Sequence, residues 1–168
     1  MAEITEQRRA AVVRNDGEYR LVTNQEVPAR AVLFTLEGEL TGTPTRYTVQ
    51  LDGRSHVDMP AGCPLEAVLD RYYWRFMNHS CEPSAVVRGR SVLSLRPIPA
   101  WSEITFHYAS TEYEMAEPFT CLCGSDHCDG VIQGFRHLAR ERREALRGLL
   151  SPYLLAVLDG RIAEPVGV

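Results

Sequence analysis

Two short segments constrain this chain more than any other part of it. Residues 75–83 read RFMNHSCEP, and residues 121–128 read CLCGSDHC. The second segment supplies three cysteines in a Cys-x-Cys-x4-Cys pattern, whereas a zinc ion held by cysteines takes four ligands in a tetrahedron. A fourth ligand must therefore come from Cys81 or Cys63, and Cys81 is favoured because it lies in the polar run Asn-His-Ser-Cys. The chain is expected to fold so that the two segments meet at a metal.

The composition fits a single small domain. The chain has 168 residues, of which 45% are hydrophobic, enough for one core and a short appendage. The five cysteines are an odd number with metal-like spacing, which favours a reducing compartment over a disulfide framework. No apolar run approaches the roughly 20 residues that cross a bilayer, and residues 1–9 lack a signal-peptide core. We expect a soluble, cytoplasmic protein without a membrane partner, with delivery elsewhere left open.

The charge of the chain favours a protein partner over nucleic acid. All 18 basic residues are arginine, and the net charge is −4. A negative chain lacks the positive field that supports phosphate binding, so direct contact with nucleic acid is not expected. A basic protein or peptide is the easier partner.

The residue pattern predicts an irregular β core followed by helices. Runs of β-branched and aromatic residues, separated by Gly, Pro and Asn, predict short strands at 19–23, 31–36, 46–51, 84–87, 91–96 and 103–108. Residues 1–16 have few apolar anchors and are expected to be a frayed or edge segment.

The C-terminal tail has a different periodicity. After Gly134, apolar residues recur at helical spacing. Ser151 and Pro152 predict the cap and first residue of a second helix, which runs through Leu158 and ends at Gly160. The apolar stripe of this tail is expected to dock on its own domain, so a monomer is favoured over a homodimer.

Three motifs in a fixed order carry a family resemblance. Residues 75–83, then the run EITFHY at 103–108, then the Cys-x-Cys-x4-Cys segment resemble the SET-domain protein lysine methyltransferases with a post-SET zinc motif. The similarity extends from Gly17 to Ile132. It implies a mainly β, SET-like fold with a C-terminal pseudoknot, a zinc-bound post-SET loop and a helical C-terminal extension. The implied divisions are an N-terminal segment 1–16, a SET domain 17–118, a post-SET loop 119–133 and an extension 134–168, without a pre-SET module.

The resemblance implies methyl transfer from S-adenosylmethionine to a lysine of a basic protein or peptide. Such a transfer is an in-line displacement and needs a neutral amine, whereas a free lysine has a pKa of about 10.4. The positive sulfonium and a dry channel would both disfavour the ammonium form.

The resemblance also assigns roles around the reacting amine. Tyr108 matches the catalytic tyrosine and is expected at the end of the strand 103–108. Alternation along that strand places Phe106 on the same side as Tyr108 and His107 on the other, so His107 is interpreted as a surface residue without a catalytic role. Phe106 implies room for di- or trimethylation. Tyr47 matches a strand tyrosine that lines the target-lysine pocket.

The remaining assignments concern the cofactor and the metal. Arg75 matches an arginine near the cofactor carboxylate, Asn78 and His79 match a pair that holds its methionine and adenine parts, and Phe119 matches an aromatic that packs on adenine. The implied ligands of a structural zinc are Cys81, Cys121, Cys123 and Cys128. His127 is a competing ligand, and Cys63 is expected to be a free thiol in a loop.

Departures from the family pattern leave alternatives open. The usual Gly-x-Gly near the cofactor is Gly17-Glu18-Tyr19 here, so Tyr19 stands at the cofactor-binding position of the second glycine, and Ser84 replaces an expected Asn. A cofactor-deficient SET-like module that binds basic peptides without methylating them is one alternative. A zinc-stabilised assembly module that uses the helical tail is another.

Overall fold

The computed structural model describes residues 8–166, in which short strands form five small sheets. The strands are β1 (Ala10–Asn15), β2 (Glu18–Thr23), β3 (Val32–Thr35), β4 (Glu39–Thr41), β5 (Val49–Gln50), β6 (His56–Asp58), β7 (Asn78–His79), β8 (Ala85–Arg88), β9 (Ser91–Ser94), β10 (Thr105–Phe106), β11 (Phe119–Thr120) and β12 (Val131–Ile132). The helices are α1 (Leu65–Asp70), α2 (Arg140–Ala145) and α3 (Pro152–Leu158), with 3₁₀ turns η1 (Tyr73–Phe76), η2 (Tyr108–Ser110), η3 (Phe135–His137) and η4 (Arg147–Leu149). No helix of residues 8–166 is both long enough and apolar enough to span a bilayer.

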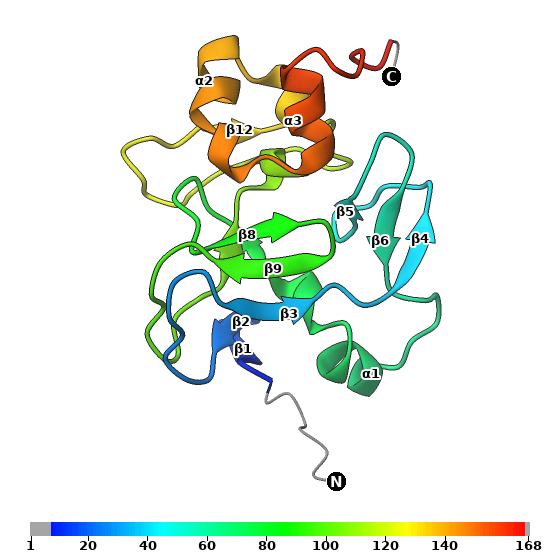
Figure 1. Cartoon of the computed structure of the whole chain (residues 1–168). Coiled ribbons are helices and arrows are strands. Elements are labelled where there is room, and N and C mark those ends of the chain that lie inside the picture. Colours follow the sequence, from blue (N-terminus) through cyan, green and yellow to red (C-terminus); the bar gives the residue numbers. More distant parts are fainter. Residues whose placement is uncertain (1–7, 167–168) are drawn as a thin grey trace, which may run out of the picture.

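The sheets surround one main core, with the helical tail on one side of it (Figure 1). β3, β9 and β8 form an antiparallel sheet, β4, β6 and β5 form a second, and the β1–β2 hairpin forms a third. Trp74 of η1 is 1% exposed at the centre, and its indole N–H donates to the carbonyl of Glu37 at 2.9 Å. The mainly β class expected from the short apolar runs is confirmed.

The N-terminal segment is an edge strand and not a frayed end where it is described. Residues 10–15 form β1, which pairs antiparallel with β2 and with no other strand of the described residues. Asp16 and Gly17 connect the two strands with φ of 49° and 85°, the left-handed conformation that two-residue hairpin turns require. Residues 1–7 of the expected N-terminal segment lie outside the described residues.

Two of the predicted strands are much shorter than expected. The strand predicted over 103–108 contains only Thr105 and Phe106, because the chain turns into η2 at Tyr108, whose carbonyl accepts from the N–H of Glu112 at 2.9 Å. The strand predicted over 46–51 contains only Val49 and Gln50, so Tyr47 lies in a turn and not in a strand.

The parallel pair β7–β10 joins the two motifs that precede the cysteine loop. Asn78 lies opposite Thr105, and His79 lies opposite Phe106. The N–H of Ser80 extends the pairing by donating to the carbonyl of Phe106 at 3.1 Å. The Asn-His segment and the segment that leads to Tyr108 are therefore fixed side by side by backbone hydrogen bonds.

The helical tail is divided into more pieces than the periodicity predicted. The first expected helix is broken into η3, α2 and η4, with Ala139 extended at ψ 152° between the first two. The guanidinium of Arg143 donates to the freed carbonyls of Leu138 and Arg136, at 3.0 and 2.8 Å. These side-chain bonds replace the backbone bonds that a continuous helix would make.

The second helix has the predicted caps and docks on the β core. The Ser151 hydroxyl accepts from the N–H of Leu154 at 3.2 Å, and Gly160 follows the helix with φ of 70°. Arg88 of β8 donates to the carbonyl of Leu149 at 3.0 Å and to that of Leu150 at 3.1 Å. The tail thus covers its own domain, as the apolar stripe predicted.

Gly134 brings the tail close to the backbone of the segment after η2. Its φ is 109°, and an added Cβ would lie 2.7 Å from the carbonyl oxygen of Tyr113 and 2.9 Å from the Cα of Glu114. We predict that Gly134→Ala lowers the free energy of unfolding by about 2 kcal/mol or more, because both the φ and the clash with backbone are unfavourable. Urea unfolding of the metal-loaded protein measures this difference.

The matched control is Gly148→Ala. Gly148 has no left-handed φ, and an added Cβ there meets no atom within 4 Å. Its unfolding free energy should stay within about 0.5 kcal/mol of the parent. Equal stability of the two variants would contradict the predicted clash at Gly134.

Candidate functional site

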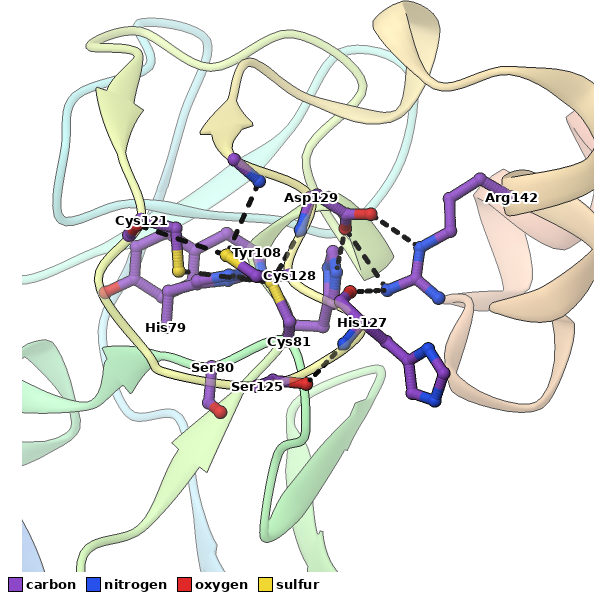
Figure 2. A network of polar contacts seen from close by, with 12 residues as sticks. His79, Ser80, Cys81, Tyr108, Cys121, Ser125, His127, Cys128, Asp129 and Arg142 are labelled. Atoms are coloured by element: carbon purple, nitrogen blue, oxygen red, sulfur yellow. Dashed lines mark hydrogen bonds and ion pairs between the residues drawn. The ribbon is translucent and has the colours of Figure 1, made fainter.

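Four cysteine thiols converge where the β7–β8 connection meets the loop between β11 and β12. Figure 2 shows three of them, those of Cys81, Cys121 and Cys128. The Sγ atoms of Cys81, Cys121, Cys123 and Cys128 all lie within 4.8 Å of one another, and those of Cys81 and Cys121 are 3.9 Å apart. Zn–S bonds of about 2.3 Å in a tetrahedron place sulfur atoms about 3.8 Å apart. The four residues predicted as ligands therefore fit a tetrahedral zinc ion.

The surroundings of the thiols also fit a bound cation. The N–H of Asp129 donates to Cys81 Sγ at 3.3 Å, and the N–H of Gly130 donates to Cys128 Sγ at 3.4 Å, which is how thiolate ligands are commonly supported. Burial raises the pKa of Cys81 and raises that of Cys121 to about 11. A divalent cation among these sulfurs would supply the charge that makes the thiolate forms stable.

The alternative ligands considered from the sequence lie outside this group. Among residues 8–166, His127 and Cys63 belong to no cluster with metal-ligand spacing, and Cys63 is an unpaired thiol in the loop before α1. A second, overlapping group consists of His79, Cys81 and His107. Its His79 is already engaged, because Nδ1 accepts the N–H of Tyr108 at 3.1 Å and Nε2 faces Cys81 Sγ at 3.3 Å. Burial, with the charge of His107 second, lowers the pKa of His79 to about 3, so this ring stays neutral.

His107 is buried, so its interpretation as a surface histidine was wrong. Its side chain has no exposed area, and Nε2 lies 2.8 Å from a carboxylate oxygen of Asp129. The other oxygen of Asp129 accepts from Nε of Arg142, on α2, at 2.6 Å (Figure 2). The loop and the helical tail cover this face of β10, which the strand pattern alone could not show. Asp129 therefore links the cysteine loop, the neighbour of Tyr108 and the C-terminal extension.

Tyr108 and Phe106 line a small pocket of about 20 Å³, which is called the channel below. Their ring centroids are 4.8 Å apart, so the prediction that they lie on one side is confirmed although the strand ends at Phe106. The Tyr108 hydroxyl donates to the carbonyl of Met77 at 2.8 Å. Burial raises the pKa of Tyr108, so the phenol keeps its proton at neutral pH. Tyr47 also lines this channel, with the Arg75 guanidinium 4.5 Å from the centre of its ring.

A larger cavity of about 680 Å³ adjoins the channel. It is lined by four of the five residues that the sequence assigned to the cofactor, namely Arg75, Asn78, His79 and Phe119, and also by Tyr108 and Tyr47. The Asn78 amide donates to Glu103 at 2.8 Å, and Arg75 forms an ion pair with Asp58. Tyr108 is among the residues that line both the cavity and the channel, so the two spaces border on the same side chain.

Tyr19 is not among the residues that line this cavity. Its ring packs against Phe76, with centroids 4.8 Å apart, whereas its neighbours Glu18 and Arg20 line the cavity. Alternation along β2 accounts for this arrangement, since successive side chains of a strand point to opposite faces. The bulky residue at the position of the second glycine therefore leaves the described cavity open.

Several lining or supporting residues were missed from the sequence. Glu112 and Met115 line the channel, Glu103 lines the cavity, and Asp129 supports the cysteine loop. Asp129 directly follows Cys128, so a carboxylate beside a metal ligand was a readable signal. No such signal marked Glu112, because this residue lies beyond the strand that was expected to end at Tyr108.

Comparison with known proteins identifies the family. The family model of the SET domain matches residues 4–109, more than half of the chain and the part that ends just after Tyr108. The chain belongs to the SET-domain family.

Relatives of this SET domain include methyltransferases. Methyltransferase flvH of Aspergillus flavus is 36% identical over 139 residues, which are 80% of this chain and 71% of that protein. The histone-lysine N-methyltransferase, H3 lysine-36 specific, of Chaetomium globosum is 29% identical over 131 residues, which are 69% of this chain but 14% of that protein. The crystal structure of KRYPTONITE in complex with mCHG DNA and SAH matches with a TM-score of 0.52 and 20% identity, over 73% of this chain and 28% of that chain. This last match supports the SET-like fold.

The metal centre gives a direct prediction about Cys81. We expect one zinc ion per chain in the parent and a loss of most of that zinc in Cys81→Ala, because three thiols leave the tetrahedron open. Metal analysis after gel filtration measures the content. Cys63→Ala is the matched control and should keep its zinc, since Cys63 is outside the cluster. Unchanged metal in Cys81→Ala would show that the fourth ligand is misassigned.

Proposed function

We propose that this SET domain is an S-adenosylmethionine-dependent protein-lysine N-methyltransferase. The observation that carries the proposal is the position of Tyr108 between a large cavity and a narrow channel. A cofactor in the cavity and a side-chain amine in the channel would meet beside its hydroxyl. Membership of the SET-domain family and the methyltransferases among its relatives support the same reaction.

The proposed cofactor contacts follow from the lining of the cavity. Arg75 is a cation suited to a carboxylate, Asn78 and His79 offer polar groups, and Phe119 offers an aromatic face. Strand β11, which leads into the cysteine loop, supplies Phe119, whose ring centroid lies 5.8 Å from that of His79. In this proposal, zinc acts only through structure, by fixing the loop that closes the cavity.

The residues of the channel would prepare the amine for attack. S-adenosylmethionine would supply an activated methyl group at the end of the cavity. The Met77 carbonyl and the Tyr108 oxygen can accept hydrogen bonds from an amine, and Phe106 restricts water beside it. Holding the amine in line with the methyl group supplies much of the rate, since orientation removes the entropy cost of an encounter.

The substrate class remains part of the proposal. A basic protein segment suits a chain with a net charge of −4, and histone-lysine methyltransferases are among the relatives. The alternative is a SET-like module that binds such segments without methylating them. Calorimetric titration with S-adenosylmethionine separates the two, because only the enzyme requires cofactor binding.

The test of the proposed function is a transfer assay. We expect label from S-adenosylmethionine to reach lysines of core histones, ribosomal proteins or poly-L-lysine. The chain itself contains no lysine, so lysine-bound label cannot arise from self-modification. Tyr108→Phe keeps the ring but loses the hydroxyl, and its kcat should fall about a hundredfold. Cofactor binding without transfer to any of these substrates would favour the non-catalytic module, and full activity of Tyr108→Phe would contradict the assigned role.

Phe106 gives a separate prediction about the product. A phenyl ring makes no hydrogen bond to the amine, which leaves room for methylated nitrogen to turn and react again. We expect mass spectrometry to show di- or trimethyl-lysine from the parent and mainly monomethyl-lysine from Phe106→Tyr, whose hydroxyl would occupy that room. A strictly monomethylated product from the parent would contradict this reading.

A further inference from the structure

Glu112 is a buried carboxylate in the wall of the narrow channel. It lines the same space as Tyr108 and Phe106 and is 7% exposed. It comes from the segment just after η2, where its N–H donates to the carbonyl of Tyr108 at 2.9 Å. Neither the cysteine cluster nor the proposed cofactor contacts account for a negative charge at this place.

The protein compensates the charge of Glu112 only in part. Oε1 accepts from the N–H of Gln50 at 2.8 Å and from the hydroxyl of Thr111 at 3.1 Å. The distance from Oε2 to Nε2 of His56 is 3.5 Å. No lysine or arginine of residues 8–166 lies within ion-pair distance of either carboxylate oxygen. Burying a carboxylate without a permanent cationic partner costs folding free energy. The presence of this carboxylate beside the channel therefore points to a cationic ligand.

Neither of the two arginines that line the channel forms an ion pair with Glu112. Arg75 forms its ion pair with Asp58. The Arg46 guanidinium lies 5.1 Å from the centre of the Tyr47 ring. Neither provides the partner that Glu112 lacks.

We propose that Glu112 receives the amino group of the substrate in the channel and stabilises the positive charge that forms on its nitrogen. This inference rests on the proposed function and adds the residue that selects an amine. An ammonium substrate would first lose a proton to water. The nitrogen of the neutral amine would then form a bond to the methyl carbon while the bond between that carbon and sulfur breaks. The electron pair of the broken bond stays on sulfur, so positive charge moves from sulfur to nitrogen. A fixed carboxylate near the nitrogen favours that movement of charge.

The same carboxylate has an opposite effect on the first step. A nearby negative charge raises the pKa of a bound ammonium, so more base is needed to release its proton. Removing the charge should therefore move the rising limb of the pH–rate profile to lower pH. The other titratable or charged residues that line this space are Arg46 and Tyr47 of the turn before β5, Arg75 of η1 and Tyr108 of η2. His56 of β6 faces the Glu112 carboxylate but does not line the channel.

The first experiment measures binding and needs no turnover. Nuclear magnetic resonance titrations compare n-pentylamine with 1-pentanol, an uncharged molecule of similar size, with and without S-adenosylhomocysteine. The parent should bind the amine about tenfold more tightly than the alcohol, and Glu112→Gln should lose this preference. Gln keeps an oxygen that can accept from Gln50, and circular dichroism verifies the fold. Equal preference for the amine in both proteins would overturn the proposal.

The second experiment uses the pH dependence of kcat with poly-L-lysine. Glu112→Gln should lower the maximum rate about tenfold and move the rising limb about one pH unit down. Glu114→Gln is the matched control, because Glu114 pairs with Arg136 and His137 and does not line the channel. A lower rate with an unmoved limb would assign Glu112 a structural role only and overturn the proposal. If the parent transfers no methyl group at all, the proposed function fails while the binding experiment still decides the role of Glu112.

Discussion

The candidate site depends on the meeting of Cys81 with the three thiols of the loop between β11 and β12. Cys81 follows β7, and β7 is held parallel to β10, so the cysteine loop is fastened to the two segments that border Tyr108. Without that contact, the loop would have few apolar anchors, since Leu122 within it is 92% exposed. Metal–ligand bonds would thus hold this loop in place, as the burial of apolar side chains does in a larger core.

The C-terminal extension holds this arrangement from the other side. Arg142 binds the carboxylate of Asp129, whose N–H donates to Cys81 Sγ (Figure 2). Arg88 of the β core donates to carbonyls of the same extension. The tail therefore connects the SET core and the cysteine loop, and Asp129 is where the three parts meet.

The sequence predicted what depends on local patterns. The Cys-x-Cys-x4-Cys spacing predicted three of the four clustered thiols, and Ser151 with Pro152 predicted the start of α3, because these signals involve residues close in sequence. The fourth thiol, Cys81, lies 40 residues before Cys121 and was marked by the run Asn-His-Ser-Cys. Errors arose where partners come from distant segments. His107 was interpreted as exposed because its cover, Asp129 with Arg142, lies beyond the strand that carries it.

The path of the chain after β10 was the other source of error. Residues 103–108 alternate like a strand. However, the N–H of Tyr108 donates to the side chain of His79 in β7, and the chain turns into η2 at Tyr108. That turn places Glu112 beside the channel, so the role proposed for it rests on the fold and not on the sequence pattern. Tyr19 shows the reverse case: it was assigned to the cofactor site because it replaces a glycine of the family pattern, but it packs on Phe76 and is not among the residues that line the cavity.

The central claim is that a metal-fastened loop completes the cofactor cavity of a methyltransferase. The most direct test is calorimetric titration of S-adenosylmethionine into the zinc-loaded protein and into protein depleted of zinc by a chelator, with circular dichroism showing that the β core persists. The account predicts one site per chain in the loaded protein and an affinity at least tenfold weaker after depletion, restored by added zinc. Equal affinity in the two forms, with the metal verified as absent, would contradict it.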